Sequence, residues 1–452
     1  MKRLVLVVSL LLALSAEAQQ AKQYSFSLDE AIQFALDSSY TAINSRREIA
    51  KALKKKWETT ASGLPQIDGA VDYQNQLKQP VTPLPGELVG QDPGTFVPVI
   101  FGVKQQMSLT ATLRQLIFDG SYLVGLQAAK VFVEYNDNAN EKTLLEVRKG
   151  VINAYGGVLL AEEGIDILEK NRQTLSENLR ETRATFESGF AEEEDVEQLQ
   201  ITLLQIENDL RNAIRMNEIS RQMLNLALGI SVDAAVNLED NLSTLTMKEI
   251  GSGIAEEAFI MDENVDFKIA NNLTSQRELE LKLEKSKALP SLNGFVNYGT
   301  TAFNQDFVFF KSETPWYQSS ILGVSMNIPI FSSLLRSART QQAKIALDQS
   351  QTQLQETIQQ IELEYHRSMS NFEYAVAKYD AATQNLRLSE RVEGKNQVKF
   401  REGIASSFDL RQAQTQLYNA QQAYIQSMVD VINAKAALET VLNTPDLGLN
   451  KE

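Results

Sequence analysis

The chain has 452 residues, a formal charge of −15, one histidine and no cysteine. The lack of cysteine excludes a disulfide scaffold and a lipid-modified N-terminal cysteine. The acidic balance disfavours a nucleic-acid partner and suits a solvated surface.

The first eighteen residues have the three parts of a secretory signal. A charged start, Met1 to Arg3, is followed by an apolar run from Leu4 to Leu14 and by small residues ending at Ala18. The apolar run is shorter than the roughly 20 residues that a membrane helix needs. We therefore predict a signal peptide over residues 1–18 and favour it over an uncleaved anchor helix.

The next elements are predicted to be one helix and two strands. The helix is expected from about Leu28 to Ser62, with Ser27 and Glu30 placed as a capping box. Strands are expected at about 65–76 and 104–116, where apolar and polar residues alternate with a period of two. The proline-rich interval between them is predicted to be an exposed loop.

A very long helix is predicted next. No proline occurs between Pro98 and Pro290, so an uninterrupted helix is permitted there. From Leu144 to Leu168 apolar residues recur in steps of three and four, which indicates a coiled-coil seam within a helix at about 121–186. A shorter helix at about 192–228 is expected to follow it.

The same order of elements is predicted again after a linker region at 230–260. A similar seam runs from Leu354 to Leu386. The predicted elements are a helix at about 262–287, strands at about 290–300 and 319–329, a long helix at about 332–400, a helix at about 407–442, and a tail at 444–452.

Matching motifs indicate an internal duplication. Leu64-Pro65 and Leu289-Pro290 each open a strand, and the two prolines are 225 residues apart. Gly189 and Gly403, at the two helix reversals, are 214 residues apart. One copy therefore carries extra residues in an insertable loop. We interpret 19–229 and 261–443 as two structural repeats.

The four predicted strands have the length and alternation of strands that cross a bilayer at a tilt. One face of each strand would contact lipid, and the other would face a lumen. A soluble sandwich is disfavoured because it would need more strands in so long a chain. The residues predicted to face lipid are Ile67, Val71, Tyr73, Leu109, Leu292, Val296, Tyr298, Leu322 and Val324.

Four strands cannot close a barrel, and an open sheet edge cannot lie in lipid because its backbone groups would lack partners. Oligomerisation must supply the closure. We favour a homotrimer with a 12-strand barrel continuous with a tube of long helices. The fold class is thus an α+β membrane protein.

The helix reversals at Gly189 and Gly403 carry acidic residues just beyond them. Glu194 and Asp195 open one returning helix, and Asp409 opens the other. Two interpretations stay open: the carboxylates only cap the helices, or they also form a ring around the axis of a trimer that favours cations.

No catalytic constellation is predicted. His366 is the only histidine and lies within a long helix, so neither a zinc site nor a Ser-His pair is expected. We expect no enzyme activity, no cofactor and no metal site.

The chain resembles the TolC-type outer-membrane efflux factors over nearly its whole length. The residues that carry the resemblance are Leu28 to Ile32, the two Leu-Pro pairs, Ile330-Phe331, and Gly403 with Asp409, Leu410, Ala413, Gln414, Leu417, Ala420 and Gln421.

The resemblance implies a homotrimer in the Gram-negative outer membrane, with a 12-strand β-barrel and a 12-helix periplasmic α-barrel. It implies a passive exit duct of a tripartite efflux pump or type I secretion system. A periplasmic membrane-fusion adaptor and an inner-membrane transporter of the resistance-nodulation-division or ABC type would be its partners.

One departure concerns the strand-to-helix junctions. The family usually has proline there, as at Pro329, but the first copy has Leu116, so that junction is expected to bend less sharply. The rival function is an envelope structural protein, a coiled-coil spacer with a small membrane anchor barrel.

Overall fold

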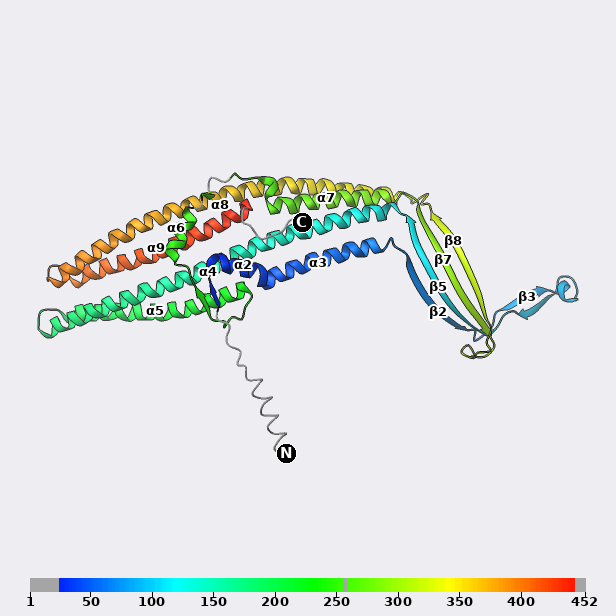
Figure 1. Cartoon of the computed structure of the whole chain (residues 1–452), viewed down its shortest axis with the longest axis horizontal. Helices are drawn as coiled ribbons and strands as arrows, with labels where there is room; N and C mark the ends of the chain where they lie inside the picture. Colours follow the sequence, from blue (N-terminus) through cyan, green and yellow to red (C-terminus); the bar gives the residue numbers. More distant parts are fainter. Residues whose placement is uncertain (1–23, 252, 255–257, 444–452) are drawn as a thin grey trace, which may run out of the picture. The chain divides into compact units, whose positions relative to one another are not determined.

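The computed structural model describes residues 24–251, 253–254 and 258–443. The predicted signal segment 1–18 and the tail 444–452 lie outside these residues. No described helix has both the length and the apolar character needed to cross a membrane. The described residues form two compact units: the first lies within 24–50, 135–271 and 352–443, and the second holds 51–134 and 272–351 (Figure 1).

The second unit contains a four-stranded antiparallel sheet with the strand order β2-β5-β7-β8 (Figure 1). Its outer strands, β2 and β8, each pair with one strand among the described residues. Both edges of the sheet are therefore open within one chain. The strands are β2 (Gln66–Asn75), β5 (Gln105–Phe118), β7 (Ser291–Asn304) and β8 (Trp316–Asn327).

The two junctions between sheet and long helix differ. β5 has a register irregularity between Leu116 and Phe118 and leads almost directly into α4 (Gly120–Glu187). Asp119 caps that helix, because Ser121 N donates to its carboxylate at 2.6 Å. β8 ends at Asn327 and α8 (Leu335–Arg401) begins eight residues later, so the junction with Pro329 is the longer and more irregular one.

A close approach holds α3 (Tyr40–Ala61) against α4 in the second unit. Tyr122 Oη donates to Thr60 O at 3.0 Å. A Cβ atom at Gly63 would lie 2.2 Å from the Tyr122 ring. Any side chain at position 63 would displace the Tyr122 ring and its hydrogen bond to Thr60, which favours glycine where the chain leaves α3 for β2. The second repeat approaches its strands through α7 (Val265–Ser286).

The first unit is helical and contains two antiparallel hairpins. One joins α4 to α5 (Glu193–Leu228), and the other joins α8 to α9 (Ser407–Leu442) (Figure 1). The two seams predicted from Leu144 to Leu168 and from Leu354 to Leu386 are buried or half-buried throughout, which confirms their inward orientation. Fully buried members of the core include Val151, Tyr155 and Val158 of α4, Met428, Val431 and Ile432 of α9, and Ala31 and Ala35 of α2.

The described residues of the predicted linker region form regular structure. It contains β6 (Val236–Leu238), which pairs in parallel with β1 (Tyr24–Phe26), and α6 (Leu242–Ile250), which packs against α9. The linker region predicted at 230–260 thus contributes buried residues, Leu242 and Leu245, to the main core.

Three predicted elements need correction. The helix expected from Leu28 to Ser62 is interrupted at Ser39, which has an extended backbone and separates α2 (Leu28–Ser38) from α3. The strand expected from about residue 319 begins earlier, at Trp316, where β8 opens. The proline-rich interval is not a plain loop, because β3 (Val81–Pro85) and β4 (Phe96–Ile100) pair within it.

Candidate functional site

The pairing register collects the predicted lipid-facing residues on one face of the sheet. Val71 lies opposite Leu109, and Val296 lies opposite Leu322. Directly opposed residues of antiparallel strands share a face, as do every second residue of one strand. All nine therefore share one face, including half-buried Leu292, and the others are exposed, Leu322 by 80%.

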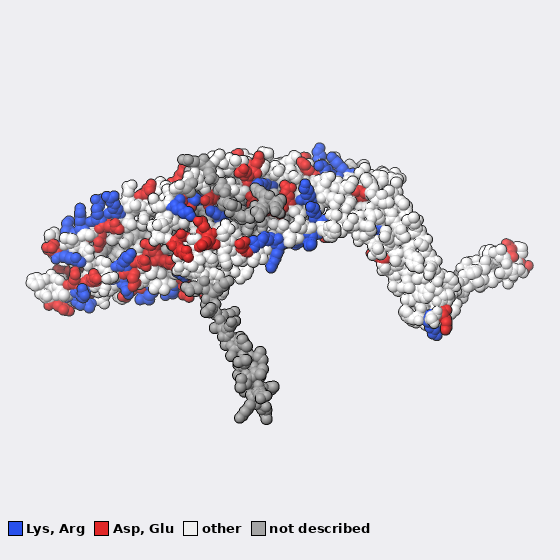
Figure 2. Space-filling model, in the orientation of Figure 1, with Lys and Arg blue, Asp and Glu red and all other residues white. Residues whose placement is uncertain are grey.

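The opposite face of the sheet is mostly polar. Arg114 Nη1 lies 2.9 Å from Asp68 Oδ2 across β2 and β5, and Asn297 Nδ2 donates to Thr112 Oγ1 at 3.0 Å across β5 and β7. Phe295 is an apolar exception, and its ring packs over Gly323. A Cβ atom at Gly323 would lie 2.3 Å from that ring. Few charged residues are visible over the sheet in Figure 2. A sheet with one exposed apolar face is suited to an apolar medium.

The two helix reversals have the same backbone geometry. Gly189 has φ +81° and Gly403 has φ +71°. In each, the residue after the glycine donates to a carbonyl five residues earlier, Phe190 N to Thr185 O at 3.0 Å and Ile404 N to Lys399 O at 2.8 Å. Together with the glycine N–H bonds to Phe186 O and Phe400 O, this is the Schellman ending of a helix.

The apolar residues after these glycines remain exposed. Phe190 is 87% and Ile404 is 76% exposed, whereas the residue at this position of a Schellman motif usually packs on its own helix. Phe408, in the first turn of α9, is also exposed, and the Arg411 guanidinium lies 5.4 Å from its ring centre. Each turn thus presents apolar side chains that another molecule could cover.

The acidic candidates take part in helix capping. Asp409 accepts hydrogen bonds from Ser406 Oγ at 2.8 Å and Ser406 N at 3.1 Å. These two donors lower the pKa of the Asp409 carboxyl. Glu194 accepts a bond from Gln198 Nε2 at 2.7 Å.

Asp195 also joins the two hairpins. It completes a capping box with Glu192 and accepts a hydrogen bond from Ser407 Oγ at the start of α9. The structure therefore brings Asp195 close to the turn that holds Asp409. Sequence analysis missed this link, because helical periodicity says nothing about contacts between hairpins.

Buried polar residues near the reversals were also missed. Asn178 and Thr182 of α4 and Ser389 of α8 are 3%, 3% and 1% exposed. Burial raises the pKa of the Glu393 carboxyl and raises that of Tyr418 to about 12. A groove of about 450 Å³ between α4, α5 and α9 lies beside Tyr418. The sequence does carry a signal for these residues, because they are polar and occupy positions that helical spacing assigns to the core.

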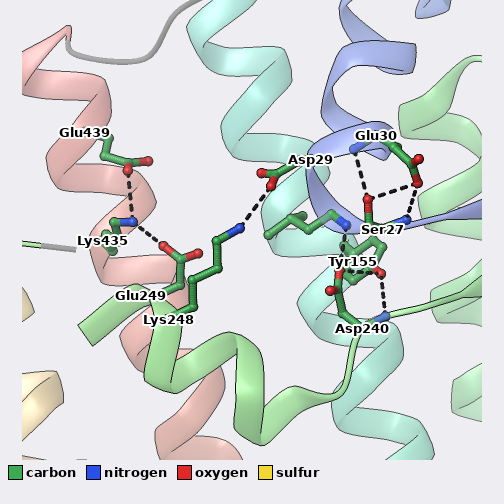
Figure 3. A network of polar contacts seen from close by, with 10 residues as sticks. Ser27, Asp29, Glu30, Tyr155, Asp240, Lys248, Glu249, Lys435 and Glu439 are labelled. Atoms are coloured by element: carbon green, nitrogen blue, oxygen red, sulfur yellow. Dashed lines mark hydrogen bonds and ion pairs between the residues drawn. The ribbon is translucent and has the colours of Figure 1, made fainter. Parts of the chain in front are cut away.

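A second polar group, drawn in Figure 3, stabilises the region between the repeats. Lys435 of α9 is 8% exposed and contacts both Glu249 of α6 and, at 3.2 Å, Glu439. Arg148 of α4 lies 2.5 Å from Glu439. The buried charges are mutually paired, as burial requires, so this cluster joins α4, α6 and α9.

The same region ties β1 and α2 to α4. Tyr155 Oη lies 3.0 Å from both Phe26 O and Asp240 Oδ2 (Figure 3). Burial raises the pKa of the Tyr155 hydroxyl above its ordinary value. Leu28 N donates to the same Asp240 oxygen at 2.6 Å. This network is structural, since every polar group is used to hold two elements together.

His366 lies on the exposed surface of α8 beside the Tyr365 ring, with ring centres 5.4 Å apart. Within the described ranges, no group of three or more His, Cys, Asp or Glu side chains is arranged to hold a metal ion.

Comparison with known sequences finds a family model that matches part of the chain. Residues 262–444 match the model of the family described as outer membrane efflux protein. The resemblance inferred from sequence motifs is thereby confirmed.

Two relatives of this chain come from Pseudomonas. The probable efflux pump outer membrane protein TtgC of Pseudomonas putida is 23% identical over 325 residues, which cover 70% of this chain and 64% of TtgC. The alkaline protease secretion protein AprF of Pseudomonas aeruginosa is 21% identical over 353 residues, covering 75% of this chain and 71% of AprF. The chain thus spans just under two thirds of the length of TtgC.

Solved structures share the fold of this chain. The outer membrane protein VceC of Vibrio cholerae has a TM-score of 0.70 at 14% identity, covering 92% of this chain and 95% of VceC. CusC has a TM-score of 0.72 at 16% identity, with 92% of each chain covered. The fold is therefore that of the TolC-type channels, mostly helical with a smaller sheet.

Proposed function

We propose that this chain forms, as a homotrimer, the exit duct of a tripartite efflux pump or type I secretion system in the Gram-negative outer membrane. The observation that carries the proposal is the sheet, with one exposed apolar face and two open edges. The family match over residues 262–444 supports it, as do the names of the relatives, an efflux pump outer membrane protein and a protease secretion protein.

Trimer formation would satisfy the sheet edges. Pairing β8 of one copy with β2 of the next closes a 12-strand barrel, which leaves no backbone edge in lipid. The helices offer matching surfaces, because α5 exposes an apolar stripe that a neighbouring copy would cover. The stripe consists of Met216, Ile219, Met223 and Leu226.

The helix reversals are proposed to serve as the periplasmic end of a 12-helix tube. Exposed Phe190 and Ile404 would give a periplasmic membrane-fusion adaptor an apolar contact at each turn. Asp195 and Asp409, with Glu194, would place carboxylates around the threefold axis of the open end. Adaptor docking and gating would then share the segments at Gly189–Asp195 and Gly403–Asp409.

The duct itself is proposed to be passive. No enzyme activity is proposed for it, so energy would come from an inner-membrane transporter of the resistance-nodulation-division or ABC type. The two repeats would have arisen by duplication, because the helix, two strands and two helices occur in the same order twice.

Single-channel recording in planar bilayers tests the function. The purified protein should give stable conductance steps, because a closed barrel with a polar inner face holds water. A coiled-coil spacer with a small anchor barrel, the alternative, would give no steps. Loss of conductance in a variant with a charge on the lipid face would tie the signal to the barrel.

A further inference from the structure

The β3–β4 hairpin, residues 81–100, has two apolar faces, and we call it the arm. The register places Val81, Phe96 and Ile100 on one face with Pro83, Pro85 and Pro98, and it places Leu84, Val97 and Val99 on the other with Thr82. The strands of the arm carry no charged residue. Figure 2 shows acidic residues only at its far end.

Much of this apolar surface is uncovered within one chain. Val81, Phe96 and Ile100 are 55%, 68% and 55% exposed. A two-stranded hairpin is at best marginally stable in water. These exposed side chains lie on one face, and Leu84, Val97 and Val99 on the other face are half-buried. The arm therefore leaves apolar surface on both faces that another molecule could cover.

Prolines prevent the arm from being covered by strand addition. Pro83 lies opposite Pro98. Proline has no N–H, so these two residues form a pair that makes no hydrogen bond within the hairpin, and their backbone nitrogens point outward, away from the partner strand. Every second residue shares that orientation, which includes Pro85. Three of the six outward N–H positions are therefore proline, and both edges resist pairing.

We propose that the arms of three copies pack face against face, each placing one apolar face on the opposite apolar face of the next arm. The inference rests on the homotrimer of the proposed function. In a cyclic trimer every copy meets its two neighbours through two different surfaces, and the arm has two apolar faces to offer. A segment that lies on lipid instead has one polar face, which the arm lacks.

Engineered cysteines test the packing, because the chain has none of its own. Phe96→Cys and Val97→Cys put thiols on opposite faces of β4. In the double variant, oxidation should link neighbouring arms into covalent dimers and trimers, whereas each single variant should stay at least tenfold less cross-linked. Lys311→Cys with Glu313→Cys, exposed in the β7–β8 connection, is the matched control and should resemble the single variants.

The native mass of the reduced double variant in detergent separates the possible failures. A trimer that does not cross-link overturns the packing of the arms and leaves the proposed duct intact. A monomer overturns both. A trimer without cross-links whose thiols are protected in cells from a membrane-impermeant maleimide would assign the arm to lipid or another surface molecule, which also contradicts the proposal.

Discussion

Single residues fix the two helix reversals. Gly189 and Gly403 occupy the left-handed region, where a Cβ atom costs about 1–2 kcal/mol. Nothing lies within 4 Å of where a Cβ would be at either glycine, so backbone conformation, and not space, requires glycine there. The sequence predicted this because two tight turns carried glycine in the same register.

Replacing Gly403 tests the role of the turn. Gly403→Val should strain the turn by about 1–2 kcal/mol and more for its branched side chain, reducing export while the amount of protein in the outer membrane stays normal. Gly394→Val is the control, because Gly394 lies within helix α8 with open space around it. Equal export by the two variants would show that the turn geometry is not needed.

Removing Asp409 tests the carboxylate ring. Asp409→Ala should lower cation selectivity of the channel, read as a smaller reversal potential in a salt gradient. The hydrogen bonds from Ser406 hold the pKa of the Asp409 carboxyl below its ordinary value of 3.8, so the wild-type carboxylate is still mostly ionised at that pH. Its contribution disappears only as pH falls further, through the lowered folded pKa. Wild-type selectivity should therefore hold from neutral pH to about pH 4.

Unchanged selectivity in both Asp409→Ala and the double variant with Asp195→Ala would leave the carboxylates as helix caps alone. The capping bonds are present in either case, so this measurement decides between the two interpretations left open by the sequence.

At the scale of elements, the sheet separates apolar from polar side chains by strand alternation. Val71→Arg or Val324→Arg should destabilise a membrane-inserted barrel by about 2–4 kcal/mol near the midplane. Asp72→Asn, on the opposite face beside Ser108, should be tolerated. The abundance of folded protein in outer-membrane fractions is the measurement, and equal losses on both faces would mean that the lipid-facing side is assigned wrongly.

The buried cluster of Lys435, Glu249 and Glu439 joins α6 to α9, and we call it the clamp. Lys435→Met should destabilise the fold by about 3–5 kcal/mol, because Glu249 would lose the buried ammonium that it contacts, whereas Glu439 would keep its pair with Arg148. Lys248→Met is the control, since its pair with Asp29 is largely exposed and should contribute at most about 1 kcal/mol. Denaturant unfolding in detergent compares the two, and similar losses would show that the buried cluster is not a clamp.

Periodicity predicted the elements well where a single face is buried. The seams of α4 and α8 and the alternation of the strands were visible because burial repeats regularly along them. The break at Ser39 was not, since one extended residue barely disturbs a helical pattern. The β3–β4 pair was hidden by its prolines, which normally argue against strands.

The candidate site was predicted only in part. Residues whose role is local, such as Ser406 capping at Asp409, follow from sequence neighbours. The Asp195–Ser407 bond and the buried charges at Lys435 join segments that lie far apart in the chain. No pattern in one sequence specifies which distant polar residues meet.

At the scale of the whole molecule, the proposed duct requires several copies of the chain to pair their sheet edges and cover their apolar surfaces. The sheet of one chain ends in two unpaired strands, β2 and β8, and hydrocarbon offers no partner for their backbone groups. Outside the sheet, the apolar stripe on α5 and the two apolar faces of the arm would also be covered by a neighbouring copy. The central claim is therefore that the chain assembles into a homotrimer.

Native mass measurement on protein extracted from outer membranes in mild detergent tests that claim most directly. We predict a single species of three chains that retains its strand content. A monodisperse monomer with the sheet intact would contradict the account, because four strands would then be stable in the membrane without closure.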